Sequence, residues 1–353
     1  MKRIIVDMMG GDLAPAETVK GVELAQKELG SDIEYILVGN KVEIEQVAEE
    51  NGIDLEEFKI VDTEVVITME DDPLSVVRAK SDSSMSVGLR MLKEGEGDAF
   101  VSTGNTGALF TGANLIVRKL KGVKRPAIAA LVPLQTPMLL VDSGANVVAT
   151  PEYLEQFAIM GSAYMSSVMG VEKPRVGLLN NGVEEHKGTE LQIETYKLLS
   201  ASEDINFVGN VEANSAVQGG CDILVTDGYT GNIFLKAIEG LGKMMLKTLK
   251  GVFYKNAKTR MSALLVKEEI GGMKKTFDAS EMGGAPILGI AKPVIKAHGS
   301  SDAKAFKNAI KQAVAFADAD IGTEIEEALA RLLEKKRQEK EESASEGNEN
   351  AEN

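Results

Sequence analysis

A repeated local pattern constrains the fold more than any other feature of this sequence. Short apolar runs are each followed by a turn of Gly, Asn or Asp and then by residues at helical spacing. Strands that are apolar throughout and alternate with helices are typical of a parallel sheet covered on both faces. We therefore expect an α/β fold with a doubly wound, mostly parallel sheet. The runs that predict strands are residues 3–6, 35–38, 99–101, 139–141, 176–179 and 223–225.

The turns after these runs predict a ligand site. Right-handed crossovers between parallel strands should place the carboxyl end of every strand at the same edge of the sheet. Open α/β sheets bind ligands at that edge, beside a switch in strand order. We therefore expect the polar turns to converge on one crevice. The alternative is that Gly and Asn only permit the positive φ values that such turns often need.

Composition excludes several classes of protein. A formal charge of −15 argues against general affinity for nucleic acid. The sequence has two histidines and one cysteine, Cys221, so we expect no internal disulfide and no zinc site or other metal. It has no Gly-x-Gly-x-x-Gly fingerprint, no phosphate-binding P-loop motif and no Gly-x-Ser-x-Gly elbow. We expect no cofactor, and Cys221 is better explained as a small core residue than as a nucleophile.

Domain organisation and location follow from the same composition. Residues 1–333 predict one α/β catalytic domain, and the polar segment 334–353 has no hydrophobic period and predicts a disordered tail. The start of the chain does not match a secretory signal, and the longest apolar stretch, 127–141, is interrupted by polar and Pro residues. We therefore expect a cytoplasmic protein.

Two turns predict phosphate binding. In the segment STGNTGA, Gly104 and Gly107 bracket Asn105 and Thr106, and the segment DGYTGN repeats the design over residues 227–232. Each turn precedes a predicted helix, whose free N–H groups and dipole favour an anion. Two such helix starts in one crevice suggest phosphate.

Two further segments supply polar candidates. In KAHGSSD, Lys296, His298 and Ser300 could face one ligand, although Ser300 or Ser301 could instead cap the helix that follows. Lys187 follows an apolar strand and a Gly turn, and it is either a phosphate contact or an ordinary solvated lysine.

A basic amphipathic segment interrupts this acidic chain. Residues 233–260 carry six lysines and one arginine against a single acid, with apolar residues at helical spacing. A second apolar cluster follows a polar break, so residues 233–266 predict a helical hairpin, which we expect to protrude from the α/β domain. Three explanations remain open from the residues alone: a core-packed helix with a solvated lysine face, docking on an anionic membrane, and attraction of an acidic carrier protein.

The order of motifs resembles a known family. The segments MMGGDLAP, AKSDSSM, STGNTGA, VDSGAN, NNGVEEHKG, TDGYTGN, GGAPILG and IKAHGSSDAKA are similar to those of the bacterial phosphate acyltransferases of phospholipid synthesis, up to about residue 325. Met8 or Met9 stands where the family usually has a small residue, and the segment around His186 also differs, so no role is carried onto His186.

The resemblance implies an activity and partners. It implies a homodimer of Rossmann-like subunits, similar to the folds of phosphate acetyltransferases and isocitrate or isopropylmalate dehydrogenases. The implied reaction moves a fatty acyl group from acyl carrier protein to inorganic phosphate. The acyl phosphate would then feed a glycerol-3-phosphate acyltransferase. The resemblance also implies peripheral association with the inner face of the plasma membrane, which favours the membrane explanation of the hairpin.

Roles for the candidate residues complete the hypothesis. Phosphate itself can attack the thioester, so the protein needs mainly to position it and to stabilise the oxyanion. The predicted catalytic residues are His298, Lys187, Asn105, Asp142, Asn146, Asn180 and Lys296. The predicted phosphate-binding residues are Gly104, Thr106, Gly107, Asp227, Gly228, Thr230, Gly231, Asn232 and Ser300. The predicted membrane contacts are Leu249, Val252, Phe253, Met261, Leu264 and Leu265.

Overall fold

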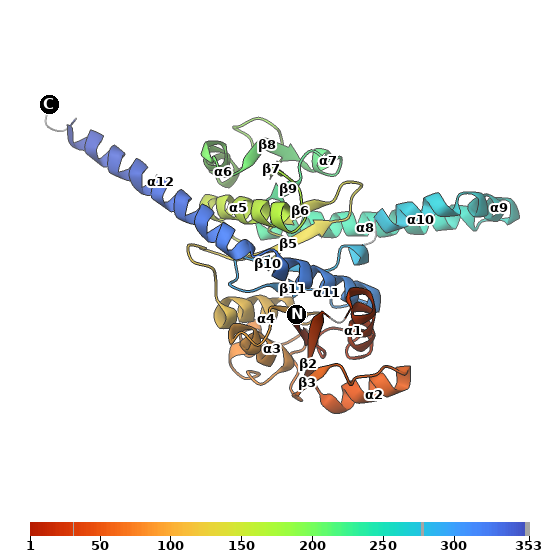
Figure 1. The fold of residues 1–353 in the computed structure, drawn as a ribbon. Helices are drawn as coiled ribbons and strands as arrows, with labels where there is room; N and C mark the ends of the chain where they lie inside the picture. Colours follow the sequence, from red (N-terminus) through yellow and green to blue (C-terminus); the bar gives the residue numbers. More distant parts are fainter. Residues whose placement is uncertain (31, 277–278, 350–353) are drawn as a thin grey trace.

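In the computed structural model, which describes residues 1–30, 32–276 and 279–349, the strands form one 11-stranded sheet. Their order across the sheet is β3-β2-β1-β4-β11-β10-β5-β6-β9-β7-β8 (Figure 1). The strands are β1 (Lys2–Asp7), β2 (Ile33–Gly39), β3 (Lys59–Asp62), β4 (Ala99–Ser102), β5 (Ala127–Val132), β6 (Met138–Val141), β7 (Arg175–Asn180), β8 (Asn206–Glu212), β9 (Ile223–Val225), β10 (Ala285–Leu288) and β11 (Val294–Lys296).

Helices alternate with these strands along most of the chain, as the sequence pattern predicts. The α-helices are α1 (Ala16–Leu29), α2 (Lys41–Asn51), α3 (Ser84–Lys93), α4 (Thr106–Gly112), α5 (Pro151–Ser167), α6 (Glu190–Ala201), α7 (Ala213–Ala216), α8 (Gly228–Phe253), α9 (Ala257–Leu265), α10 (Lys267–Thr276), α11 (Ala303–Asp318) and α12 (Ile321–Glu349). Short helical turns span Pro73–Val77, Ala113–Val117 and Ala279–Glu281. The predicted α/β class with a mostly parallel sheet is confirmed.

The sheet consists of two parallel blocks that run in opposite directions. Strands β1, β2, β3, β4 and β11 are parallel to one another, and so are β6, β9, β7 and β8. Between the blocks, the pairs β11–β10, β10–β5 and β5–β6 are all antiparallel. Three successive reversals leave the second block antiparallel to the first.

The expectation that all polar turns share one edge is therefore wrong. The turns after β1, β4 and β11 lie at one edge of the sheet, and those after β6, β7 and β9 lie at the opposite edge. The physical cause is a hairpin inside the longest apolar stretch of the chain, where the segment between Val132 and Met138 turns β5 back as β6. We call the two sets of turns the first-edge loops and the second-edge loops.

Successive strand residues are buried on alternate faces of the sheet, so both faces are covered by a core. On β1, Ile4 and Val6 join one large core under α1, α11, α5 and α12, whereas Ile5 joins a core under α3 and α4 on the other face. On that second face a separate core lies under the start of α8, where Phe234, Leu235 and Ile238 pack against it. The second face thus has two cores, one for each block.

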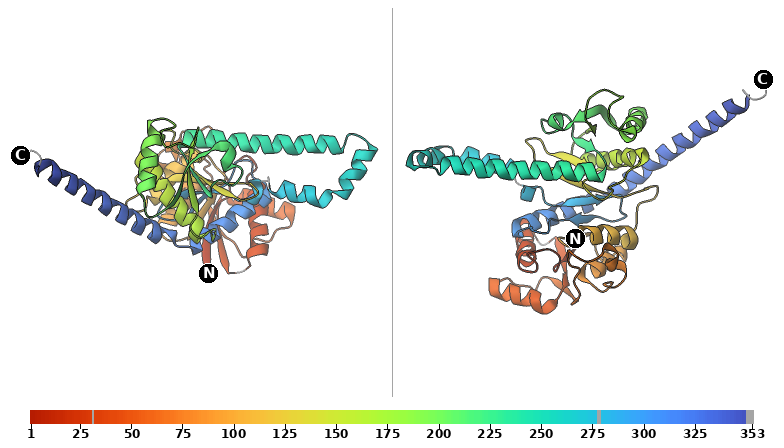
Figure 2. Two further views of the ribbon diagram at one scale, coloured as in Figure 1. Left: turned by 90° about the horizontal axis from the view of Figure 1, so that it is seen from above. Right: turned by 180° about the vertical axis from the view of Figure 1, so that it is seen from behind.

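A helical arm projects from the second block. Figure 2 shows α8 running outward, α9 at the tip and α10 returning toward the body. Of the 26 residues of α8, only Gly228 and Gly231 are buried, and α9 has no buried residue. The predicted protruding hairpin is confirmed, and its returning limb, α10, lies beyond the predicted boundary at residue 266.

The C-terminal segment differs from its expectation. Where the sequence predicts a disordered tail from residue 334, α12 continues as a helix through Glu349, and it projects away from the body (Figure 1). Lys336 pairs with the buried Glu155, and Arg337 pairs with Glu341 one turn ahead, so charge pairs support a helix that has little apolar contact. None of the helices in the described part of the chain is long and apolar enough to cross a membrane.

Candidate active site

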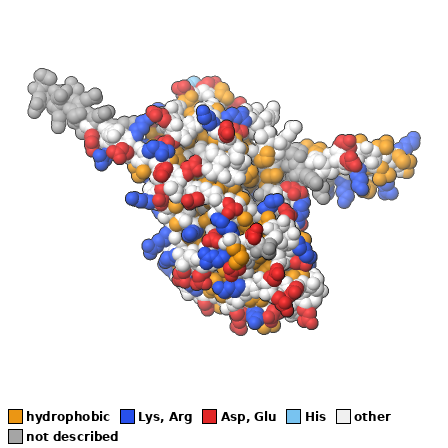
Figure 3. All heavy atoms as spheres, viewed as in Figure 1, with side chains coloured by type: hydrophobic (Ala, Val, Ile, Leu, Met, Phe, Trp, Pro, Cys, Tyr) orange, Lys and Arg blue, Asp and Glu red, His pale blue; other side chains and the backbone are white. Residues whose placement is uncertain are grey.

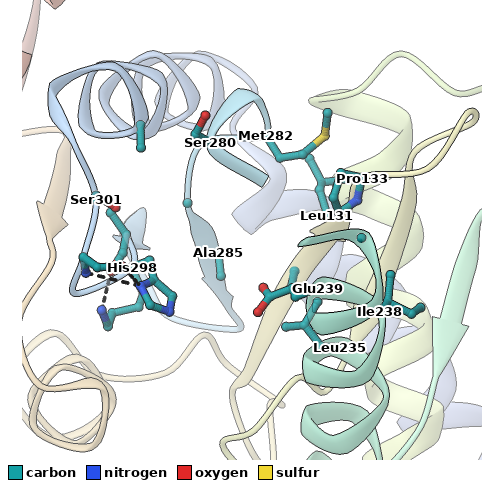
Figure 4. A pocket seen from close by; sticks show the side chains of 18 of the residues that line it. Leu131, Pro133, Leu235, Ile238, Glu239, Ser280, Met282, Ala285, His298 and Ser301 are labelled. Atoms are coloured by element: carbon teal, nitrogen blue, oxygen red, sulfur yellow. Dashed lines mark hydrogen bonds between the residues drawn. The ribbon is translucent and has the colours of Figure 1, made fainter. Parts of the chain in front are cut away.

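A cavity of about 490 Å³ opens at the first edge of the sheet, beneath α8. Its floor comes from the ends of β11 and β5, the beginning of β10 and the loop before α11. Figure 4 shows His298 and Ser301 on one side of the cavity and Leu131, Pro133 and Ile238 on the other. The cavity therefore has a polar end and an apolar wall. The polar lining includes Thr106, Lys296, His298, Ser300 and Ser301, and the apolar lining includes Leu131, Pro133, Leu235, Ile238, Leu246 and Met282.

Lys296 is a buried cation at the polar end. Its side chain ends β11, and the residue is only 8% exposed. The ammonium group donates hydrogen bonds to the carbonyl oxygens of Thr103, at 3.2 Å, and Ala297. Burial lowers the pKa of Lys296 to about 8, although the carboxylates of Asp7 and Asp12 act in the opposite direction. Among the described residues its hydrogen-bond partners are carbonyl oxygens, and a buried ammonium in such a setting favours an anionic ligand beside it.

Asp7 lies behind this group, where the strand order switches between β1 and β4. The buried carboxylate accepts hydrogen bonds from Ser102 Oγ at 2.6 Å, from Ser84 Oγ at 2.7 Å and from the Met9 N–H at 3.2 Å. Burial raises the pKa of Asp7 despite these bonds. Asp7 is not among the site residues predicted from the sequence. Its signal was an acid directly after the apolar run 4–6 and three residues before Gly10.

The first-edge loops are locked together around Lys296. The Thr103 hydroxyl donates to the carbonyl oxygen of Gly10, and the Asp12 N–H donates to the carbonyl oxygen of Gly299 at 2.8 Å. A Cβ atom added at Gly10 would lie 2.6 Å from the backbone nitrogen of Gly104, so only glycine permits this close approach. The three loops therefore form one rigid surface.

The turn after β4 is used mainly for structure. Asn105 Oδ1 caps α4 by accepting the Ala108 N–H at 3.1 Å, and its Nδ2 donates to the carbonyl oxygens of Thr68, Met69 and Asp71. The side chain of Asn105 is therefore already engaged. Its neighbour Thr106 lines the cavity, whereas Gly104 and Gly107 support the turn from outside it.

His298 and Ser300 face the cavity as a pair. Nδ1 of His298 accepts the N–H of Ser300 at 3.2 Å and lies 2.9 Å from the hydroxyl of Ser300. Because Nδ1 accepts a hydrogen bond, the neutral ring carries its proton on Nε2. The helix that follows is capped by Asp302, whose Oδ1 accepts the Ala305 N–H at 2.9 Å. The residue that caps α11 is therefore Asp302, and neither Ser300 nor Ser301 caps it.

The second-edge loops form a separate cluster around Asp142. One carboxylate oxygen of Asp142 accepts the N–H groups of Ile128, Gly144 and Ala145, and the other accepts the N–H and the side-chain amide of Asn146. The carboxylate is buried, and burial raises the pKa of Asp142. These bonds fold the loop tightly, so Asp142 and Asn146 act here as its scaffold.

The start of α8 packs directly on that loop. The Gly228 N–H donates to the carbonyl oxygen of Asn146 at 2.8 Å, and a Cβ atom at Gly231 would lie 1.9 Å from the carbonyl oxygen of Asp142. Asp227 caps α8 by accepting the N–H of Thr230 at 2.9 Å and its hydroxyl at 2.7 Å. Asn232 faces Gly144 across this contact.

Asn180 and Lys187 lie at the end of β7, at the same edge as Asp142. The side-chain amide of Asn180 donates to the carbonyl oxygen of Lys187 at 3.0 Å, and Lys187 itself is exposed. None of the second-edge candidates lines the cavity among the residues that the structure describes. The predicted site residues are thus divided between two edges of the sheet.

Other nucleophile and metal candidates lie outside both clusters. Cys221 is buried against Met138, and burial raises the pKa of its thiol to about 12, as suits a core residue. The described residues contain no group of His, Cys, Asp and Glu side chains that could hold a metal ion.

Comparisons with known proteins agree with this architecture. A family model described as "Fatty acid synthesis protein" matches residues 2–323. A phosphate acyltransferase from Acetivibrio thermocellus is 47% identical over 316 residues, which cover 89% of this chain and 93% of that protein. A phosphate acyltransferase from Thermoanaerobacterium thermosaccharolyticum is 43% identical, covering 93% of this chain and 96% of that protein.

Solved structures show the same fold at low sequence identity. A phosphotransacetylase from Streptococcus pyogenes has a TM-score of 0.60 and 18% identity, with 90% of this chain and 94% of that chain covered. The EutD phosphotransacetylase from Staphylococcus aureus has a TM-score of 0.57 and 15% identity, with the same two coverages. These likenesses establish the fold alone.

The buried ammonium of Lys296 predicts a specific dependence of stability on pH. Its pKa is about 8 in the folded protein, against 10.5 for a lysine side chain in water. Below pH 8 the ammonium keeps its proton in both the folded and the unfolded chain. Folding then carries the full cost of burying the charge. As the pH rises above 8, the folded state loses the proton first, and stability rises. From pH 7.5 to 9.5, the free energy of unfolding of the wild type should increase by about 2 kcal/mol relative to Lys296→Met. Urea unfolding at several pH values measures this, and parallel profiles would contradict it.

Proposed function

Since the chain belongs to the fatty acid synthesis protein family, we propose that it transfers a fatty acyl group from acyl carrier protein to inorganic phosphate. The product is an acyl phosphate for phospholipid synthesis, which a glycerol-3-phosphate acyltransferase would consume. The family match and the relatives named phosphate acyltransferase support transfer of an acyl group to phosphate. The carrier protein as donor is our further step.

The observation that carries the proposal is the combination of a buried cation and an apolar wall in one cavity. Lys296 and the His298–Ser300 pair provide charge and hydrogen-bond donors at the polar end. The opposite wall offers apolar contacts from β5 and α8. Phosphate and a fatty thioester need these two environments side by side.

The reaction requires little covalent chemistry from the protein. An oxygen of phosphate attacks the thioester carbonyl carbon, and the tetrahedral oxyanion collapses with cleavage of the C–S bond. The thiolate then takes up the proton that hydrogen phosphate loses, so the products are the acyl phosphate and the free thiol. Lys296 would hold phosphate by its charge, and Nε2–H of His298 would donate to the oxyanion or to the leaving sulfur. Thr106 and Ser300 would orient the phosphate.

The second-edge residues keep a separate proposed role. Lys187, Asn180 and the start of α8 from Asp227 to Asn232 offer charge, amide groups and a helix N-terminus at the other edge. We propose that they contact the phosphoryl or carrier portion of a substrate in the assembled homodimer. Asp142 and Asn146 would act there by holding the loop.

Kinetics test the proposed site directly. Lys296→Met should raise the KM for phosphate at least tenfold, because it removes the buried charge, and His298→Ala should lower kcat by roughly 10² to 10⁴. The matched control is Lys292→Met, since Lys292 is exposed and lies just before β11 whereas Lys296 ends it. Phosphate-dependent release of thiol from hexadecanoyl-acyl carrier protein is the assay.

The same assay separates the competing functions. Unchanged kinetics in both Lys296→Met and His298→Ala would remove the cavity from the mechanism. Faster turnover of acetyl-coenzyme A than of acyl carrier protein would indicate a short-chain phosphate acetyltransferase. Reduction of NAD would indicate a dehydrogenase, and absence of thiol release with every thioester would leave a membrane adaptor.

The arm offers a docking surface for the acidic carrier protein. Lys243 lines the cavity, Lys236 lies nearer the start of the same helix, and Lys247 and Lys250 lie farther out along it. Figure 3 shows Lys and Arg side chains along one side of the arm and hydrophobic side chains toward its tip. Opposite charges would steer a carrier protein toward the cavity mouth.

We also propose a homodimer that forms around the second-edge loops. Exposed apolar side chains gather there: Val148 is 84% exposed, Val147 63%, Val183 62%, Tyr229 60% and Ile233 53%. Such a concentration is typical of an interaction surface. A twofold partner on this surface would also cover the beginning of α8.

A double substitution tests the dimer. Val148→Glu with Ile233→Glu should convert the protein to a monomer in light scattering, because two carboxylates would be buried without partners. Val42→Glu is the control, since Val42 is 72% exposed on α2, far from these loops in the fold. A monomeric wild type, or a double variant that stays dimeric, contradicts the proposal.

The tip of the arm is proposed to contact the anionic inner face of the plasma membrane. Met261, Leu264 and Leu265 are 67%, 71% and 82% exposed on α9, and Val252 is 55% exposed at the end of α8. Lys255, Lys258 and Arg260 lie between these positions, so apolar insertion and attraction to anionic lipid would act together. Leu249 and Phe253 are partly covered and would support the contact.

Vesicle binding tests the membrane contact. Leu264→Glu with Leu265→Glu should lower co-sedimentation with phosphatidylglycerol vesicles at least tenfold, because each carboxylate opposes insertion and is repelled by the lipid. Circular dichroism should show an unchanged fold, since both positions are exposed. Val42→Glu again serves as the control, and equal binding by all three proteins contradicts the proposal.

A further inference from the structure

We propose that the apolar wall of the cavity binds the acyl chain and that the face of α8 around Gly242 sets the chain length that the enzyme accepts. This inference rests on the proposed function. It adds the place where the fatty chain binds and the residues that determine which chain lengths are accepted.

The lining residues of α8 form one continuous stripe. They are Leu235, Ile238, Glu239, Gly242, Lys243 and Leu246. Leu235, Ile238, Gly242 and Leu246 follow steps of three and four residues along one face of the helix, and the charged Glu239 and Lys243 border that line. The stripe from 235 to 246 is about 16 Å long. An acetyl group would touch about one 5.4 Å turn of that stripe. A wall of this length suits a long hydrocarbon chain.

The stripe is anchored at one end and open at the other. Leu235 and Ile238 pack against the buried core beneath the start of α8, and that core fixes this part of the wall. Gly242 and Leu246 lie farther along the helix, toward the arm. A chain that enters beside Leu235 would therefore reach Gly242 only after its first carbons are bound.

The polar end fixes the direction of the chain. In Figure 4, His298 lies across the cavity from Leu131 and Ile238, with Ala285 and Glu239 between them. A thioester carbonyl held near Lys296 and His298 would direct its hydrocarbon toward α8. Both ends belong to one cavity, so a single acyl thioester can occupy them together.

Gly242 is the position where a side chain would obstruct this path. Glycine in the middle of a helix is unfavourable by itself. Because Gly242 has no side chain, it leaves room on the face of α8 that lines the cavity. Each methylene that is buried adds about fourfold in affinity. A substitution that excludes several methylenes should therefore change chain-length selectivity by a large factor.

Two glycines on the same helix provide a matched experiment. Gly242→Leu places a side chain on the lining stripe, whereas Gly240→Leu points into open space, because no atom lies within 4 Å of a Cβ built at Gly240. The measured quantity is the ratio of kcat/KM for hexadecanoyl-acyl carrier protein to that for hexanoyl-acyl carrier protein. This ratio should fall at least tenfold in Gly242→Leu and should stay within twofold of the wild type in Gly240→Leu.

A second substitution protects the test against misfolding. Leu246→Ser removes apolar surface farther along the stripe and should lower the same ratio at least threefold. Thermal unfolding should confirm that all three variants fold. If Gly242→Leu does not fold, the ratio for Leu246→Ser decides the question.

The outcomes separate this inference from the proposed function. The chain-binding inference alone is overturned if Gly242→Leu and Leu246→Ser turn over both carrier substrates with the same ratio of kcat/KM values as the wild type. No release of thiol from either substrate by the wild type overturns the proposed function and this inference with it. A ratio that falls equally in Gly240→Leu also overturns it, because the effect would then not depend on the cavity.

Discussion

The buried ammonium group of Lys296 is the constraint from which the site follows. Removing a cation from water is costly, and two carbonyl oxygens replace only part of its hydration. The locked loops after β1, β4 and β11 hold the charge in place, and the close approach of Gly10 to Gly104 leaves them little freedom. An anionic ligand would add to the partial counter-charge that the carboxylates of Asp7 and Asp12 supply. The buried charge thus lowers the stability of the folded protein, and phosphate that binds beside Lys296 would restore it.

The reversal of the sheet gives this polar site its apolar wall. Because the second block runs antiparallel to the first, α8 begins at the opposite edge, beside Asp142, and passes the cavity as it runs outward. One helix therefore connects the second-edge loops, the apolar wall and the exposed arm. A fully parallel sheet would have placed the start of α8 beside the first-edge loops, with its apolar face elsewhere.

Much of the fold was predictable from local pattern. The strands β1, β2, β4, β6, β7 and β9 and the projecting hairpin follow from residues close together in sequence, whereas β3, β5, β8, β10 and β11 were not predicted. The direction of the second block was not predictable, because it depends on a hairpin hidden within one apolar stretch and on the late strands β10 and β11. The helical continuation of α12 was also missed, since its support comes from charge pairs and not from an apolar face.

The types of residue in the candidate site were predictable from the sequence. Which of these residues lie together in space was not predictable. Lys296, His298 and Thr106 share a cavity, as the sequence pattern predicts, but Lys187 and Asn232 do not line it. Asp7 was overlooked because a lone acid at a strand end carries no spacing signal. Its importance appears only when the strand order places it beside Ser102 and behind Lys296.

A crystal structure of the protein soaked with inorganic phosphate tests the central claim most directly. We expect an oxygen atom of the bound phosphate to lie about 2.7–2.9 Å from Nζ of Lys296, at the polar end of the cavity. Phosphate bound only among the second-edge loops, with Lys296 still paired to carbonyl oxygens alone, would contradict it.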